Sequence, residues 1–236
     1  MSLQQLTLNL QARDEATLEN FYVGDNEELM CALKLLEHSR EKLLYLWGGM
    51  GSGRTHLLLA SCNKFSAQGV GTAIYIPLSD AEFTPESLRD LAGLPLLCID
   101  DLDQAVGNRA WEEALFDCCN ERFNNNVATV IGASATPAAL NFIMPDLQSR
   151  MNSGLIFEVK KLNDEQKLAA LRLRAQCLGL ELPDVTARFL LGHYLRDTHA
   201  LFALLHRLDR ASLVAQRCLT IPFVKEILQQ EDGAVL

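Results

Sequence analysis

A glycine-rich segment around residue 50 has the residue types and spacing of a phosphate-binding loop. It reads Gly-Gly-Met-Gly-Ser-Gly-Arg-Thr over 48–55, directly after the apolar run 43–47. This fits the pattern of glycine, four residues, glycine, a cation and Ser or Thr, with arginine where lysine is usual. Glycines let successive backbone N–H groups turn towards a phosphate, and the helix that follows presents its positive end. We expect the phosphates of a nucleotide to be bound by Gly49, Gly51, Ser52, Gly53, Arg54, Thr55 and His56.

Two adjacent carboxylates, Asp100 and Asp101, follow the apolar run 96–99. A buried strand that ends in such a pair delivers the carboxylates to the sheet edge where phosphates and metal bind. Each motif alone has a simpler explanation: a glycine-rich strand-to-helix turn for the loop, and an acidic turn for the pair. Together and in this order they favour nucleotide binding, with Thr55 and Asp100 as candidate ligands of magnesium. Arg54 keeps the usual positive charge as a planar fork, which favours retention of a bound nucleotide over rapid turnover.

The elements that must position these residues are indicated by apolar runs that alternate with helical periodicity. Strand candidates lie at 43–47, 72–76, 95–99, 127–132 and 155–159. Helical character is clearest before the first of them, at 26–39, and between successive ones, at 54–67 and 108–123. This alternation predicts an α/β fold in which a parallel sheet lies between helices. After Asn163 and Asp164, which offer a helix N-cap, we expect only helices, over 164–178, 184–195, 197–215 and 221–230.

The chain is therefore expected to have three parts. Residues 1–12 form an extended segment, because Leu6, Leu8 and Leu10 alternate with polar residues. Residues 13–161 form a nucleotide-binding α/β domain. Residues 162–236 form a small all-helical domain.

Composition and charge exclude several classes of protein. No apolar run approaches the roughly 18–20 residues that cross a bilayer, and the N-terminus lacks a signal-peptide pattern. We expect a cytoplasmic protein without membrane contact. The seven cysteines have no regular spacing and none of the five histidines joins them at zinc spacing, so we expect reduced thiols and no structural metal. A formal charge of −9 disfavours tight binding to DNA phosphates, so DNA should be met only through a partner.

Four motifs together resemble the AAA+ module of the bacterial replication initiator DnaA. They are the phosphate loop, Leu-Cys-Ile-Asp-Asp at 97–101, Val-Ile-Gly-Ala-Ser at 130–134 with a proline at 137, and Asp-Leu-Gln-Ser-Arg at 146–150. The segment Gln-Leu-x-Leu-x-Leu at 5–10, the arginine in the loop, and Leu-Thr-Ile-Pro-Phe-Val-Lys-Glu-Ile-Leu at 219–228 are similar to DnaA-related proteins that inactivate the initiator. The resemblance covers most of the chain. It implies an AAA+ P-loop domain with a helical lid.

The resemblance also implies partners and a ligand. Proteins of this kind bind ADP or another nucleoside diphosphate, dock on the DNA-loaded sliding clamp and stimulate ATP hydrolysis by DnaA. The N-terminal segment would bind the clamp through Gln5, Leu6, Leu8 and Leu10. An edge strand of the protein's own sheet also fits their alternation. We do not expect direct recognition of an origin sequence, because the residues up to Leu236 leave no segment that matches the helix-turn-helix domain of DnaA. A homo-oligomer is compatible with the sequence.

Residue roles follow from the same resemblance. Arg150 matches the arginine finger, against the simpler explanation of a surface arginine on a helix. Ser134 falls at the sensor 1 position, and His199 stands in sensor 2 where the family usually has arginine, so a full hydrolytic set in the chain itself is not expected. The segment that lines the base pocket in this family is matched by Phe21, Tyr22 and Val23, which also suit core packing. Besides a regulator of DnaA, a self-sufficient AAA+ ATPase and a structural clamp-binding module remain open.

Overall fold

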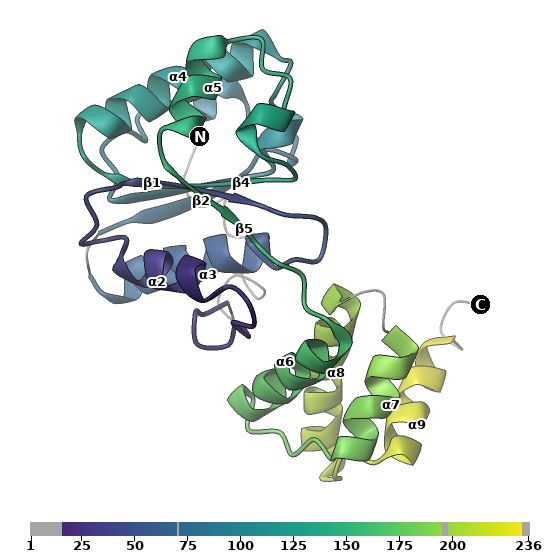
Figure 1. Cartoon of the computed structure of the whole chain (residues 1–236). Coiled ribbons are helices and arrows are strands. Elements are labelled where there is room, and N and C mark those ends of the chain that lie inside the picture. The colour runs from purple at the N-terminus through teal and green to yellow at the C-terminus, as the bar shows by residue number, and fades with distance from the viewer. Residues whose placement is uncertain (1–15, 70, 195–197, 233–236) are drawn as a thin grey trace. The chain divides into compact units, whose positions relative to one another are not determined.

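The computed structural model describes residues 16–69, 71–194 and 198–232 (Figure 1). The chain divides into two compact units, Met1–Lys161 and Leu162–Leu236. The first is an α/β domain and the second is helical.

The first unit is built on a parallel sheet, as the alternation of apolar runs predicts. Its strands are β1 (Leu43–Trp47), β2 (Ala73–Pro77), β3 (Leu96–Asp100), β4 (Ala128–Ala133) and β5 (Leu155–Glu158). They lie in the order β2-β3-β4-β1-β5, and every neighbouring pair is parallel. The central strands β3 and β4 are buried along their whole length, which explains their continuous apolar sequence. The α/β fold class is confirmed.

Helices cover both faces of this sheet. One face carries α2 (Glu27–Leu35) and α3 (Arg54–Ala67), and the other carries α4 (Arg109–Asn124) and α5 (Pro145–Asn152) (Figure 1). Alternate residues of the strands serve the two sides: Leu44 and Leu46 join the core under α2 and α3, whereas Tyr45 joins the core under α4 and α5. Within the described residues, three short 3-10 helices lie in the connections, η2 (Pro85–Leu88), η3 (Leu102–Gln104) and η4 (Pro137–Ala139).

A fully buried arginine fixes the end of α4 to the start of β4. Arg122 donates from Nε to Thr129 Oγ1 at 2.8 Å, from Nη1 to the Leu91 carbonyl at 2.6 Å, and from Nη2 to the Ala128 carbonyl. Burial lowers the pKa of Arg122, yet its planar fork satisfies three acceptors, two from β4 and one from the connection before β3. The sheet edge where strands begin is thereby tied to the helix above it.

The second unit contains α6 (Asp164–Cys177), α7 (Asp184–Tyr194), α8 (Thr198–Ala215) and α9 (Ile221–Asp232). The Asn163 side chain accepts from the Gln166 N–H at 2.9 Å, and the Gln166 side chain accepts from the Asn163 N–H at 3.0 Å, so the N-cap at Asn163 is confirmed. Leucines from α6, α7 and α8, together with Phe223 and Val224 of α9, form a core of their own. Among the described residues, no helix is long and apolar enough to cross a membrane.

Candidate functional site

The glycine-rich loop joins β1 to α3 at the edge where the strands end. Trp47 pairs in register with Ala133 of β4, and the Gly48 N–H donates to the Ala133 carbonyl at 3.2 Å. The backbone at Gly53, the N-cap of α3, has φ +98°, a conformation that glycine adopts without strain. The first backbone N–H groups of α3 therefore point out of the sheet edge. Together with the loop they form the kind of cradle in which phosphates bind.

Two buried polar atoms of the loop have no hydrogen-bond partner within the described part of the chain. They are Ser52 Oγ and Arg54 Nη1. Only Nη2 of Arg54 has an ionic neighbour, Asp101 Oδ1 at a long 3.9 Å. A buried polar group without a partner costs free energy, and an anion in the loop would satisfy both atoms. The residues present therefore fit a nucleotide phosphate.

The acid at the end of β3, Asp100, is completely buried against the loop. Its Oδ2 accepts from Thr55 Oγ1 at 2.6 Å and from the Tyr75 hydroxyl at 3.1 Å. Its Oδ1 accepts from the Asp101 N–H at 2.9 Å and lies where a side chain on Gly132 would be. A hydroxyl and a carboxylate in contact at the phosphate edge are the oxygen ligands that magnesium takes. Thr55 and Asp100 therefore fit that ion.

Asp101 is oriented differently from its neighbour. Its backbone has φ +55°, which is rare for a residue with a side chain and is often found at functional sites. Its Oδ2 accepts from Ser79 Oγ at 2.6 Å, while Oδ1 faces Arg54. The second acid is thus partly neutralised by the loop's own cation.

Ser134 lies at the end of β4, beside the start of the loop, and is exposed. Its N–H donates to Asp103 Oδ1 at 2.8 Å. Burial alone would raise the pKa of Asp103, but hydrogen bonds from Ser134 and from its own backbone lower it below its ordinary value. A third carboxylate is therefore held near Asp100 and Asp101.

The segment 21–23, which is predicted to line a base pocket, also lies next to the loop. A methyl group built on Gly53 would lie 2.8 Å from Cε2 of Phe21. The Phe21 ring also lies 5.7 Å from the ring of His56, whose Nε2 is 3.0 Å from the Thr17 carbonyl oxygen. Tyr22 and Val23 follow as half-buried residues. The structure therefore places the aromatic ring of Phe21 next to the phosphate-binding loop.

Arg150 lies near the N-terminal ends of the strands, whereas the phosphate loop follows their C-terminal ends. Its Nε and Nη2 both donate to Asn120 Oδ1 of α4, at 3.0 and 2.6 Å, and its guanidinium lies 4.5 Å from the ring centre of Phe123. Arg150 lines a cavity of about 230 Å³ together with Leu43, the first residue of β1, and Thr129, the second residue of β4. The length of β1, roughly 13 Å, separates this edge from the loop.

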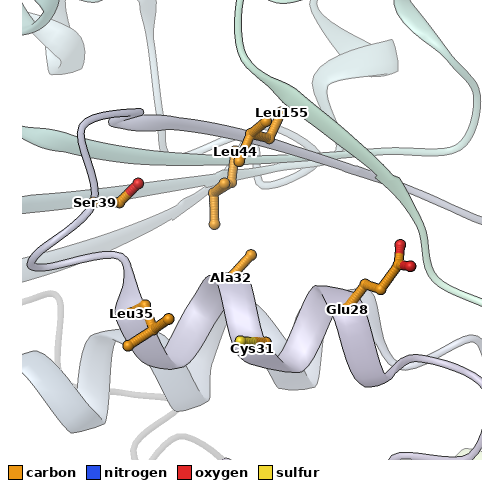
Figure 2. A pocket seen from close by; sticks show the side chains of 7 residues that line it. All are labelled: Glu28, Cys31, Ala32, Leu35, Ser39, Leu44 and Leu155. Atoms are coloured by element: carbon orange, nitrogen blue, oxygen red, sulfur yellow. The ribbon is translucent and has the colours of Figure 1, made fainter.

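A second hollow, of about 360 Å³, lies away from both places. It is bounded by α2, β1 and the edge strand β5, and Figure 2 shows Leu44 pointing from β1 towards Ala32 of α2. Its lining is apolar apart from Glu28, Cys31 and Ser39. It has no residue in common with the phosphate loop.

Some predicted site residues are not placed. Gln5, Leu6, Leu8 and Leu10 lie outside the described residues. His199 belongs to α8 of the second unit, and its side chain falls outside the described part as well.

Sequence reasoning missed Tyr75, Ser79, Asp103 and Asn120. Tyr75 and Ser79 hold the two predicted acids, and Asn120 holds Arg150. The only available signal was for Asp103, a further acid two residues after Asp101. The others come from segments that only the fold brings to the site.

Comparison with known proteins agrees with this architecture. The family described as "Bacterial DnaA ATPAse domain" matches residues 12–158, and the family described as "Hda, lid domain" matches residues 164–228. An uncharacterized protein of Haemophilus influenzae is 44% identical over 228 residues, which are 95% of this chain and 98% of that protein.

Two solved structures share the fold. Domain III of the Thermotoga maritima replication initiation protein DnaA has a TM-score of 0.74 at 22% identity, over 92% of this chain and 96% of that one. AMPPCP-bound DnaA from Aquifex aeolicus has a TM-score of 0.64 at 22% identity, over 75% of this chain and 60% of that one. With the two family matches following one another along the sequence, the chain belongs to the DnaA-related AAA+ family and carries an Hda-type lid.

Proposed function

We propose that this protein is an ADP-bound regulator of replication initiation that stimulates ATP hydrolysis by DnaA. The observation that carries the proposal is the position of Arg150, which lies at the sheet edge opposite the phosphate loop of its own chain. An arginine at that edge is suited to complete the nucleotide site of a neighbouring subunit. The DnaA and Hda family matches support DnaA as that neighbour.

The phosphate loop is proposed to hold the protein's own nucleotide. The unpartnered Ser52 Oγ and Arg54 Nη1, the α3 N-terminus and the Thr55–Asp100 contact support a nucleoside diphosphate with magnesium. A ligand that binds only the folded state raises the melting temperature by mass action. Saturating ADP should therefore raise the melting temperature of nucleotide-free protein, and Gly53→Val should abolish the rise. Unchanged wild-type melting would refute ADP binding.

Arg150 is proposed to act in trans on ATP bound to DnaA. A guanidinium placed against the transferred phosphoryl group stabilises the charge that develops in the transition state. Arginine fingers contribute about 10³–10⁵-fold in rate. Asn120 and Phe123 support this role, because they hold the planar group with neutral contacts and leave its charge available to a phosphate.

The decisive experiment compares Arg150→Ala with Arg109→Ala in a DnaA hydrolysis assay with clamp and DNA. Arg109 is a suitable control because it is the first residue of α4, far along the helix from Asn120, and it pairs with Glu113 on the surface. We expect Arg150→Ala to lose stimulation of DnaA while keeping ADP affinity. Arg150→Lys should rescue little, because a point charge does not reproduce the fork. Wild-type stimulation by Arg150→Ala would refute the trans mechanism, and Arg150-dependent hydrolysis by the protein alone would favour a self-sufficient ATPase.

Clamp docking is proposed for the N-terminal segment, with Gln5 at the rim of a pocket and Leu6, Leu8 and Leu10 as apolar anchors. Deletion of residues 1–11 should abolish clamp pull-down and leave the melting temperature almost unchanged. If the deletion instead lowers the melting temperature and clamp binding persists, the segment is an edge strand of the protein's own sheet.

A further inference from the structure

The last residues of the first unit run alongside the phosphate loop. After β5, the Val159 N–H donates to the Trp47 carbonyl at 2.7 Å, so the chain stays beside the end of β1. Buried Asn26 then holds Lys160 from both sides: its Oδ1 accepts from the Lys160 N–H at 2.8 Å, and its Nδ2 donates to the Lys160 carbonyl at 3.3 Å. The same Nδ2 donates to the Val23 carbonyl at 3.0 Å. The backbone that precedes Lys161 is therefore fixed between the loop and the proposed base-pocket segment.

This fixed backbone brings the side chain of Lys161 over the loop. A methyl group built on Gly49 would lie 2.9 Å from Cε and 3.0 Å from Nζ of Lys161. Any residue larger than glycine at position 49 would displace the lysine. Lys161 is exposed, and no carboxylate of the described residues forms an ion pair with it. Its charge remains available to a ligand in the loop.

The charge balance of the site favours such a ligand contact. Three carboxylates, Asp100, Asp101 and Asp103, lie at this edge of the sheet, and Arg54 shares its charge with one of them. A nucleoside diphosphate is itself an anion, so a second cationic side chain beside the shared arginine would favour its binding next to these acids, in addition to the α3 N-terminus and magnesium. A compact ammonium group is suited to bind phosphate oxygen as a point charge.

We propose that Lys161 binds a phosphate oxygen of the nucleotide in the loop, as a second cation beside Arg54. This inference rests on the proposed nucleotide binding. It assigns to the residue before the helical unit a part in phosphate recognition, and a side chain at position 49 would occupy the place of its ammonium group.

The test is a titration of nucleotide-free full-length protein with ADP and with adenosine at two salt concentrations. A charged hydrogen bond of this kind, weakened by solvent exposure, should be worth about 3- to 30-fold in Kd. Lys161→Ala should weaken ADP binding by that factor, leave adenosine binding unchanged and reduce the salt dependence for ADP. Lys161→Arg should retain most of the affinity. Lys160→Ala is the matched control, because it removes the neighbouring ammonium and keeps the backbone contacts with Asn26.

The outcomes separate this inference from the function on which it rests. If wild-type protein binds no adenine nucleotide, the proposed function fails and the role of Lys161 fails with it. If wild-type protein binds ADP and Lys161→Ala binds it equally well, the role of Lys161 alone is wrong. Equal losses for ADP and adenosine would also overturn it, since they would mean that Lys161 supports the shape of the pocket and not its affinity for phosphate.

Discussion

Replacement of Gly132 by alanine is the sharpest test of the packing around the buried carboxylate of Asp100. Gly132 lies in β4 beside the end of β3, and a methyl group built there would collide with Oδ1 of Asp100 and lie 3.3 Å from Cδ2 of Leu58. Asp100 has little freedom to retreat, because Thr55, Tyr75 and its own next backbone N–H hold both oxygens. The substitution must therefore displace the carboxylate or shift the strand.

The expected cost follows from these contacts. Overpacking a buried site by one methyl group costs about 1–3 kcal/mol. Loss of a hydrogen bond to a carboxylate, here the one from the Asp101 N–H to Asp100, adds about 1.5–3 kcal/mol. Alanine in a strand returns about 0.5–1 kcal/mol relative to glycine. We expect Gly132→Ala to lower the free energy of unfolding by roughly 2–5 kcal/mol.

Urea unfolding followed by tryptophan fluorescence measures this change in the right part of the chain. Both tryptophans, Trp47 and Trp111, lie in the first unit, so the signal does not depend on whether the helical unit unfolds separately. Gly93→Ala is the control, because a methyl group there meets no atom within 4 Å, and it should change the stability by less than about 0.5 kcal/mol. If Gly132→Ala unfolds at the wild-type urea concentration, the described packing around Asp100 is wrong.

Three further predictions test other parts of the structure. Arg122→Lys should lower the free energy of unfolding by about 2–4 kcal/mol in the same assay, because one ammonium cannot reach all three acceptors, which lie in β4 and at Leu91. Asn120→Ala should leave the melting temperature and ADP affinity near wild type and reduce stimulation of DnaA about tenfold, because Arg150 loses the acceptor that orients it. Thr55→Ala should remove the magnesium dependence of ADP affinity, measured by titration with and without a chelator, since it deletes the hydroxyl that contacts Asp100.

The sequence was sufficient for the fold because a parallel sheet leaves a strong signal. Strands buried on both faces, such as β3 and β4, appear as unbroken apolar runs, and their predicted bounds differ from the observed ones by one residue at each end. The strand order could not be obtained in the same way. That β1 lies between β4 and β5 depends on where each crossover returns to the sheet, and the periodicity of a run contains no information about its neighbours.

The candidate site shows the same division between local and distant contacts. The phosphate loop is one continuous segment, so its glycine spacing could be read directly. By contrast, Tyr75 reaches Asp100 across 25 residues, and Asp103 reaches Ser134 across 31. Lys161 approaches Gly49 from more than a hundred residues away in the sequence. Such contacts depend on strand order and register, which the spacing of residue types does not specify.

The two ends of β1 provide the chain with two chemically different sites on one rigid sheet. At the end of the strand, a nucleotide would interact with the charged groups of the loop, with the acids and with Lys161. At its beginning, Arg150 has only neutral partners, so its charge is not neutralised within the described residues. Substitutions further apart than about 7–10 Å with no shared partner usually have additive effects. The length of β1, roughly 13 Å, exceeds that range. Loss of Arg150 and loss of the loop should therefore act independently on stability, and any coupling between them in the DnaA assay must pass through the partner.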